Sequence, residues 1–316
     1  MLNYLFDYLQ SVNFPGAGMF EYVTFRAIFA LVLSLIISVW FGKYFIRLLK
    51  RRNISETQRD EKLDPFGVGK VGVPTMGGVI IIAAIMVSVL LICNLTNIYV
   101  ILLIFTTLWC GALGFADDYI KVFRHNKEGL SEKKKLAGQV ALGFIIGLTV
   151  WVSPDIVVRE NVMTENIHVT AERSELNVNS EKLVQSSSWH KEDVVKSTKT
   201  TIPFVKNHEF DYKWLSPFKG KWGWYCKWAI YVLMIILVIT ACSNGTNLTD
   251  GMDGLAAGTS ASVGVVIGIL AWLGGNILNA GYLNIMYMPG TGEIAIFMSA
   301  FVGALMGFLW YNSFPA

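Results

Sequence analysis

Charged residues are scarce in this 316-residue sequence: Asp, Glu, Lys and Arg make up 16% of it, whereas apolar residues make up 53%. A soluble domain carries about 25% charged residues. The deficit is spread over several apolar runs of roughly 18 residues or more, which is typical of a helical protein that crosses a membrane several times. The composition therefore argues against a soluble enzyme or binding module.

Cysteine and histidine are also scarce, with four of each in the sequence. The cysteines fall singly in or beside apolar segments, and no CxxC or Cys/His spacing occurs, which argues against a zinc site and a disulfide framework. Three of the histidines are scattered through one polar region, and we interpret them as solvated. Residues 1–10 have no basic stretch before their apolar residues, so no cleavable signal is predicted.

The apolar runs predict an all-α fold, a polytopic transmembrane helical bundle with about seven spans. They divide the chain into residues 1–152 with spans one to four, an insertion at 153–226, and residues 227–316 with spans five to seven. The predicted spans are residues 22–49, 76–94, 98–122, 136–152, 227–241, 255–273 and 293–311.

The distribution of basic residues predicts the orientation of these spans. The loops after spans one and three are dense in Lys and Arg, whereas the loop between spans two and three has none. By the positive-inside rule the N-terminus lies outside, and loops 1–2, 3–4 and 5–6 are cytoplasmic. Residues 153–226 are then a small extracytoplasmic soluble insertion.

One polar stretch, residues 244–254, lies between spans five and six. It holds two amides, two hydroxyls, two carboxylates and three glycines. Such groups are costly in lipid, so we expect a cytoplasmic loop that faces water, an ion or a polar ligand. The alternative is a simple polar turn, for which Gly, Asn and Asp supply the dihedral angles. A turn needs only two or three such residues, which favours a binding site.

A pair of adjacent carboxylates, Asp117 and Asp118, lies near the cytoplasmic end of span three. Two neighbouring carboxylates repel each other and are costly near hydrocarbon, and a divalent cation would relieve both costs. Lys121 follows Asp117 by four residues and shares its helix face. The alternative is a solvated helix end whose charge the lysine compensates.

Residues 67–78 are rich in glycine and include Lys70, just before span two. Glycines spaced in this way let backbone N–H groups approach an anion, and Lys70 adds a positive charge. The Walker spacing is absent, so this is not a P-loop. A flexible segment leading into the span is the alternative.

All three polar segments are predicted at the cytoplasmic boundary, and none lies at mid-membrane, where a transporter would bind its substrate. A site at this boundary can hold a soluble phosphorylated donor and a lipid phosphate together. Carboxylates for Mg²⁺, lysines for phosphate and amides for a polar headgroup are the groups that phosphoryl transfer requires.

These segments resemble the polyprenyl-phosphate N-acetylhexosamine-1-phosphate transferase family. Pro-Thr-Met-Gly-Gly at 74–78 favours the muramoyl-pentapeptide branch over the N-acetylglucosamine branch. The resemblance covers nearly the whole chain apart from 153–226. Its other motifs are Phe-Ala-Asp-Asp-Tyr at 115–119, Leu130-Ser131 with Lys135 and Gln139, the stretch 244–255, and Trp-Tyr-Asn-Ser-Phe-Pro-Ala at 310–316.

The resemblance implies a Mg²⁺-dependent reaction in the bacterial inner membrane, with the active site on the cytoplasmic face. UDP-MurNAc-pentapeptide and undecaprenyl phosphate would give lipid I and UMP, in one step or through an aspartyl-phosphate. It also implies a homodimer in the bilayer and no nucleic-acid partner. The residues implied are Asp117, Asp118, Asn247 and Asp250 for catalysis, Asp117, Asp118 and Asp250 for metal, and Lys70, Thr75, Lys121, Lys135, Asn244, Gly251 and Asp253 for substrate.

The chain departs from the family pattern in two respects. The family continues beyond residue 316 with a further Mg²⁺-binding aspartate, a histidine-rich motif and more spans, about ten in all. The chain therefore resembles a truncated enzyme, and we expect low or no activity from it. The insertion at 153–226 is longer than usual. Other interpretations are a GlcNAc-1-phosphate transferase, a cation-coupled transporter, and an inactive remnant that acts only as a membrane partner.

Overall fold

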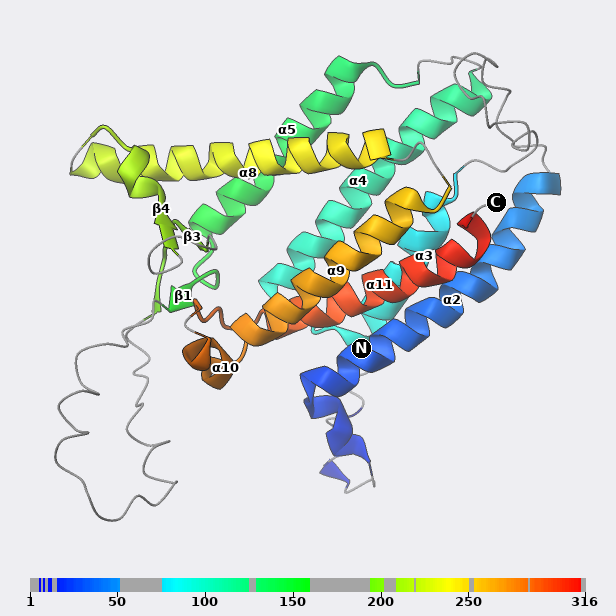
Figure 1. Cartoon of the computed structure of the whole chain (residues 1–316), viewed down its shortest axis with the longest axis horizontal. Helices are drawn as coiled ribbons and strands as arrows, with labels where there is room; N and C mark the ends of the chain where they lie inside the picture. Colours follow the sequence, from blue (N-terminus) through cyan, green and yellow to red (C-terminus); the bar gives the residue numbers. More distant parts are fainter. Residues whose placement is uncertain are drawn as a thin grey trace.

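The computed structural model is a bundle of long helices, drawn in Figure 1. Each of the seven predicted spans corresponds to one helix, so the predicted all-α membrane fold is confirmed. Six of these helices are long and apolar enough to cross a membrane, and α3 is a shorter apolar helix. The helices are α2 (Val23–Arg51), α3 (Gly78–Ile92), α4 (Ile98–Phe123), α5 (Glu132–Val152), α8 (Lys221–Thr249), α9 (Leu255–Gly274) and α11 (Gly292–Asn312). The structure describes residues 6, 8, 11–12, 16–51, 76–124, 129–159, 194–201, 209–218, 220–249, 253–283 and 285–313.

The closest helix pair, α2 and α11, packs through small residues. A side chain at Gly303 would collide with the carbonyl oxygen of Leu31, and one at Gly307 would lie 2.7 Å from Ser38 Cβ. The Ser38 hydroxyl donates to the carbonyl of Ala304 at 2.9 Å. Helices in lipid associate through such close backbone approach and interhelical hydrogen bonds, because burial of apolar side chains gains little there.

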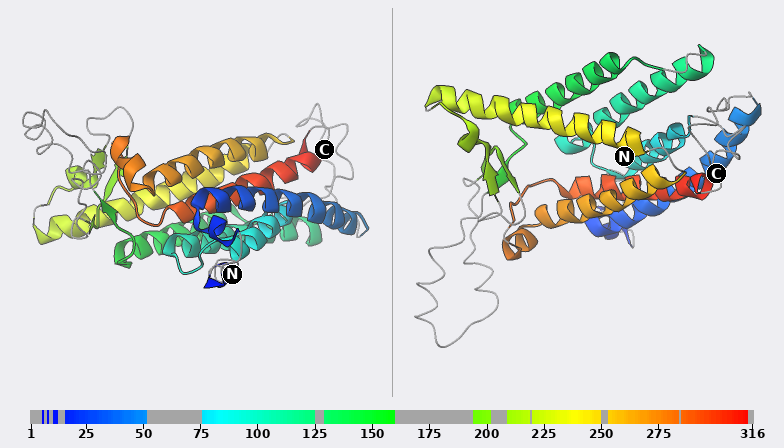
Figure 2. Two further views of the ribbon diagram at one scale, coloured as in Figure 1. Left: turned by 90° about the horizontal axis from the view of Figure 1, so that it is seen from below. Right: turned by 45° about the horizontal axis from the view of Figure 1, so that its top comes forward.

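Helices α5 and α8 form a second pair, which lies beside the α2–α11 group in Figure 2. A side chain at Gly143 would lie 2.8 Å from the Cα of Ile236, and one at Gly147 would lie 2.8 Å from Val232 Cγ1. The two glycines are one helical turn apart, so they fix which residues of α5 face which residues of α8. This register determines the geometry of the site below.

Helix α8 corrects one prediction. The sequence predicted a span at residues 227–241 and a loop from residue 244, but α8 runs from Lys221 to Thr249. Near lipid, a helix satisfies its backbone groups internally. The Thr246 and Thr249 hydroxyls donate to the carbonyls of Cys242 and Gly245, at 2.9 and 2.8 Å. These polar side chains therefore bond within the helix instead of ending it.

The described parts of the insertion form short antiparallel pairs at the left of Figure 1. Lys196 Nζ donates to the last carbonyls of α5, those of Trp151 and Val152, at 2.7 and 3.1 Å. Arg159 bridges to Tyr287, in the segment before α11. The base of the insertion therefore fastens α5 to the α9–α11 connection. Its elements are β1 (Val158–Arg159) paired with β2 (Val194–Val195), β3 (Lys199–Thr201) paired with β4 (Glu209–Asp211), and η5 (Tyr212–Leu215). The remaining elements are η1 (Ala17–Glu21) and α10 (Ile277–Tyr282).

Candidate functional site

The predicted site residues that the structure describes lie at the end of the bundle opposite the insertion. In Figure 1 this end contains the end of α4, the start of α5, the end of α8 and the start of α9. Successive helices run in opposite directions, so segments distant in sequence meet here. The predicted placement of this end on the cytoplasmic side of the membrane stays a prediction.

Asp117 is the centre of the site. Its carboxylate is 12% exposed and lies between two ammonium groups: Lys121 Nζ is 2.8 Å from Oδ2 and Lys135 Nζ is 3.0 Å from Oδ1. The backbone N–H of Leu130 also donates to Oδ1, at 2.7 Å. The prediction that Lys121 shares a helix face with Asp117 is therefore confirmed. The carboxylate is buried, unlike a solvated helix end, but Lys121 compensates its charge as the alternative interpretation also expects.

The two ammonium groups at Asp117 remain partly accessible. The side chains of Lys121 and Lys135 are 44% and 29% exposed. A lysine binds phosphate as a point charge, and its attraction is strengthened where water is partly excluded. The arrangement can therefore hold an anion while Asp117 keeps the two ammonium groups together.

Gly129, shortly before α5, lies against the Asp117 carboxylate. Gly129 has a φ of +66°. A Cβ at this position would lie 2.5 Å from Asp117 Oδ1 and 2.7 Å from Lys121 Cε. Glycine is thus required here both for the left-handed backbone and for the close approach of the carboxylate.

Gly129→Ala is expected to destabilise the protein by about 1–2 kcal/mol, from the left-handed backbone alone. The added methyl group would also displace Asp117 from Leu130. The free energy of unfolding, measured in lipid nanodiscs, tests this. Gly258→Ala is the matched control, because its added Cβ would meet nothing within 4 Å. Alanine favours a helix over glycine by about 1 kcal/mol, so the control should be neutral or stabilising. Equal destabilisation by both changes would contradict the role given to Gly129.

Gln139 joins this cluster to the polar end of α8. It lies one helical turn after Lys135 on α5 and is 7% exposed. Its Nε2 donates to Ser243 Oγ at 2.9 Å and to Asn244 Oδ1 at 3.1 Å. Asn244 Nδ2 donates back to Gln139 Oε1 at 3.3 Å. One face of α5 thus contacts Asp117 of α4 through Lys135 and Asn244 of α8 through Gln139.

The other predicted residues divide into two groups. Asp118 is half-buried next to Asp117, Asn247 is exposed on the last turn of α8, and Asp253 is half-buried in the turn before α9. The convergence of Asp117, Asp118, Asn247 and Asp250 on one pocket stays a prediction. Four predicted residues lie outside the part that the structure describes: Lys70, Thr75, Asp250 and Gly251.

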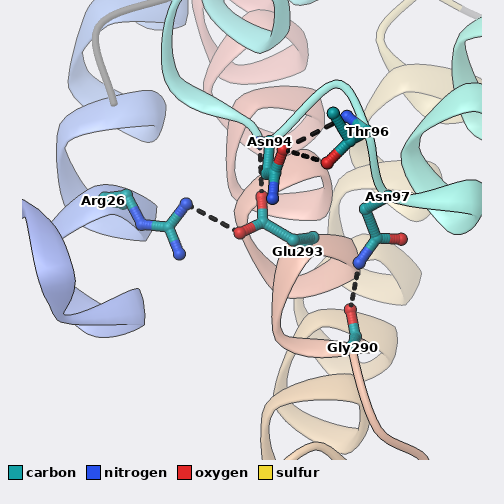
Figure 3. Close-up of polar contacts among 6 residues, drawn as sticks. All are labelled: Arg26, Asn94, Thr96, Asn97, Gly290 and Glu293. Atoms are coloured by element: carbon teal, nitrogen blue, oxygen red, sulfur yellow. Dashed lines mark hydrogen bonds and ion pairs between the residues drawn. The ribbon is translucent and has the colours of Figure 1, made fainter. Parts of the chain in front are cut away.

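The sequence analysis missed a second polar cluster, at the other end of the bundle (Figure 3). Arg26 Nη1 lies 2.7 Å from Glu293 Oε1, and the backbone N–H of Asn94 donates to Glu293 Oε2 at 2.9 Å. Asn97 Nδ2 donates to the carbonyl of Gly290 at 3.0 Å. Arg26 lies inside the predicted span 22–49 and Glu293 inside the predicted span 293–311. A charged residue inside a span was the signal that could have identified this cluster. These contacts join α2, α11 and the α3–α4 turn, which is a structural role.

Comparison with known proteins identifies similar sequences along the whole chain. A family model described as glycosyl transferase family 4 matches residues 194–316. A phospho-N-acetylmuramoyl-pentapeptide transferase of Phocaeicola vulgatus is 56% identical over 316 residues, which is 100% of this chain and 71% of the relative. The protein of the same name from Bacteroides thetaiotaomicron is 53% identical with the same coverage. That from Flavobacterium psychrophilum is 48% identical over 318 residues, 100% of this chain and 74% of the relative.

Proposed function

The chain belongs to the phospho-N-acetylmuramoyl-pentapeptide transferase family, and we propose that it transfers phospho-MurNAc-pentapeptide from UDP-MurNAc-pentapeptide to undecaprenyl phosphate. The products are lipid I and UMP, and the reaction belongs to peptidoglycan synthesis. The observation that carries this proposal is 48–56% identity over the whole chain to relatives of that name. These relatives favour neither the GlcNAc-1-phosphate transferase nor the cation-coupled transporter.

The cluster around Asp117 supports the chemistry of this transfer. An oxygen of the lipid phosphate attacks the phosphorus that carries the sugar, and the bond from that phosphorus to the UMP oxygen breaks. Lys121 and Lys135 would hold the diphosphate with their ammonium groups. Asp117 or Asp118 would take the proton of the lipid phosphate. Asn247 and Asp250 are proposed to act in catalysis, and Lys70, Thr75, Asn244, Gly251 and Asp253 to contact the substrates.

We propose Mg²⁺ as the cofactor, because the predicted ligands are all carboxylates. Asp117, Asp118 and Asp250 offer hard carboxylate oxygens. Among the residues that the structure describes, no three His, Cys, Asp or Glu residues gather as a metal site. Mg²⁺ at phosphoryl-transfer sites is held by one or two carboxylates together with substrate phosphates, so a preformed cage of three is not needed. When bound, the ion would neutralise charge on the diphosphate.

The proposed location is the bacterial cytoplasmic membrane, with the Asp117 end facing the cytoplasm. The apolar helices make the chain a multi-pass membrane protein. The basic residues at the Asp117 end, among them Arg51, Lys121 and Arg124, support the cytoplasmic placement. UDP-linked donors are soluble, and a boundary site gives access to them and to the lipid. We also propose that the protein is a homodimer.

Release of UMP from defined donors tests the proposed function. Two proteins are purified into nanodiscs that contain undecaprenyl phosphate: the chain itself, and a chimera that continues it with the part of the Phocaeicola vulgatus relative that it does not cover. UMP release is expected from UDP-MurNAc-pentapeptide in the presence of Mg²⁺, with loss of activity in EDTA. The chain spans 71% of that relative, so activity is measured with both proteins.

UDP-GlcNAc is the control donor in the same assay. Equal or faster release of UMP from UDP-GlcNAc would favour the GlcNAc-1-phosphate transferase. No release from either donor by the chimera would contradict the proposed function. Full turnover by the chain alone would overturn only the expectation that it is impaired.

A further inference from the structure

We infer that Gln139 is a positioning residue, which orients the Asn244 amide and holds the end of α8 in register with the Asp117–Lys135 pair. The inference rests on the proposed function, and it assigns a role to a residue that the proposed reaction leaves unused. Gln139 is buried, and the remaining residues between Leu136 and Leu142 are all Leu, Ala, Gly or Val. A lone buried amide costs free energy unless its hydrogen bonds are made. Here both of its polar atoms have partners on α8.

The two hydrogen bonds between Gln139 and Asn244 fix the orientation of both amide groups. Asn244 accepts from Gln139 with its oxygen and donates to it with its nitrogen. Rotation of either amide by 180° would place like atoms opposite each other, so each amide determines the other. The close approach of Gly143 and Gly147 to α8 prevents the helices from sliding past each other. These contacts together set the orientation of the Asn244 amide and the position of Asn244 along α5.

The same face of α5 sets the position of Lys135. Residues 135 and 139 are one helical turn apart on α5. The helix therefore fixes the distance between the Lys135–Asp117 contact and the Gln139–Asn244 contact. Asn247 lies three residues after Asn244, on the same side of α8. A shift of the end of α8 would move both asparagines relative to the proposed phosphate-binding lysines. Misplacement of a contacting group by about 1 Å can cost a hundredfold in rate.

Gln139→Leu removes the amide and retains a side chain of similar size. In the chimera we expect kcat/KM for UDP-MurNAc-pentapeptide to fall by about tenfold or more, because the shift of α8 moves both Asn244 and Asn247. Ser243→Ala is the matched control, because it removes one partner of Gln139 and leaves the Asn244 pair intact. It should stay within about threefold of wild type. Asn244→Ala should add little when Gln139 is already replaced, since the two residues then act as one unit.

Amide hydrogen exchange of residues 243–249 gives a second measurement, on the chain itself in nanodiscs. These amides should exchange about tenfold faster in Gln139→Leu, whereas those of α2 should be unchanged. Unchanged exchange, an unchanged kcat/KM, equal effects of Ser243→Ala, or additive effects with Asn244→Ala would each overturn the inference. If wild-type chimera has no activity, the proposed function fails, and the exchange measurement still decides whether Gln139 positions α8.

Discussion

Asp117→Asn is expected to lower the rate of UMP release by the chimera by about a thousandfold. Asparagine keeps the size of the side chain but removes the negative charge between two ammonium groups that lie 2.8 and 3.0 Å from the carboxylate. Without it, Lys121 and Lys135 repel each other, so the proposed phosphate-binding pair would separate. A candidate base for the lipid phosphate is lost as well. Steady-state turnover with UDP-MurNAc-pentapeptide measures the effect.

The adjacent lysines of α5 provide the matched control for this cluster. Lys135 contacts Asp117, whereas Lys134 is exposed. Lys135→Gln should therefore lower turnover by about a hundredfold, and Lys134→Gln should leave it within about twofold. Asp117→Asn at more than a tenth of the wild-type rate would show that this carboxylate is not needed. Equal losses for the two lysine variants would show that α5 contributes only its general positive charge.

The helices were predictable because a membrane constrains them strongly. A span needs a long apolar run. Both ends of six helices, among them α4 and α9, lie within about four residues of the predicted bounds. Helix α8 was the exception, since residues 242–249 are polar and gave no sign of helix. The Thr246 and Thr249 hydroxyls bond to carbonyls one turn back, and Gln139 of α5 bonds to Ser243 and Asn244. Hydropathy shows neither.

The site was predictable only where its contacts are local. Spacing alone placed Lys121 beside Asp117, because residues four apart share a helix face. The contacts of Asp117 with Leu130 and Lys135 depend on how the α4–α5 turn folds, and the pairing of Gln139 with Asn244 depends on the register of α5 against α8. These are tertiary contacts. The motifs marked the right residues, but the geometry that joins them required the structure.

Glu293→Ala is expected to lower the free energy of unfolding by about 3–5 kcal/mol, the largest stability effect we predict. The side chains of Arg26 and Glu293 are 10% and 11% exposed, so removal of the carboxylate leaves a buried guanidinium without its counter-charge. The backbone N–H of Asn94 loses its acceptor as well. Unfolding of the chain in nanodiscs or mixed micelles, followed by circular dichroism, measures the loss.

Three further variants separate the charge from the packing. Glu293→Gln keeps an oxygen for Asn94 and should be less destabilising than Glu293→Ala. The double change Arg26→Met with Glu293→Leu removes both charges together, and it should be less destabilising than Glu293→Ala, since apolar replacement of a buried pair is often nearly neutral. Asp155→Ala, at an exposed position, should change stability by less than about 0.5 kcal/mol. If the double variant were as unstable as the sum of its two single changes, the two residues would not act as a pair, and the cost of Glu293→Ala would have to come from lost packing at the α2–α11 contact.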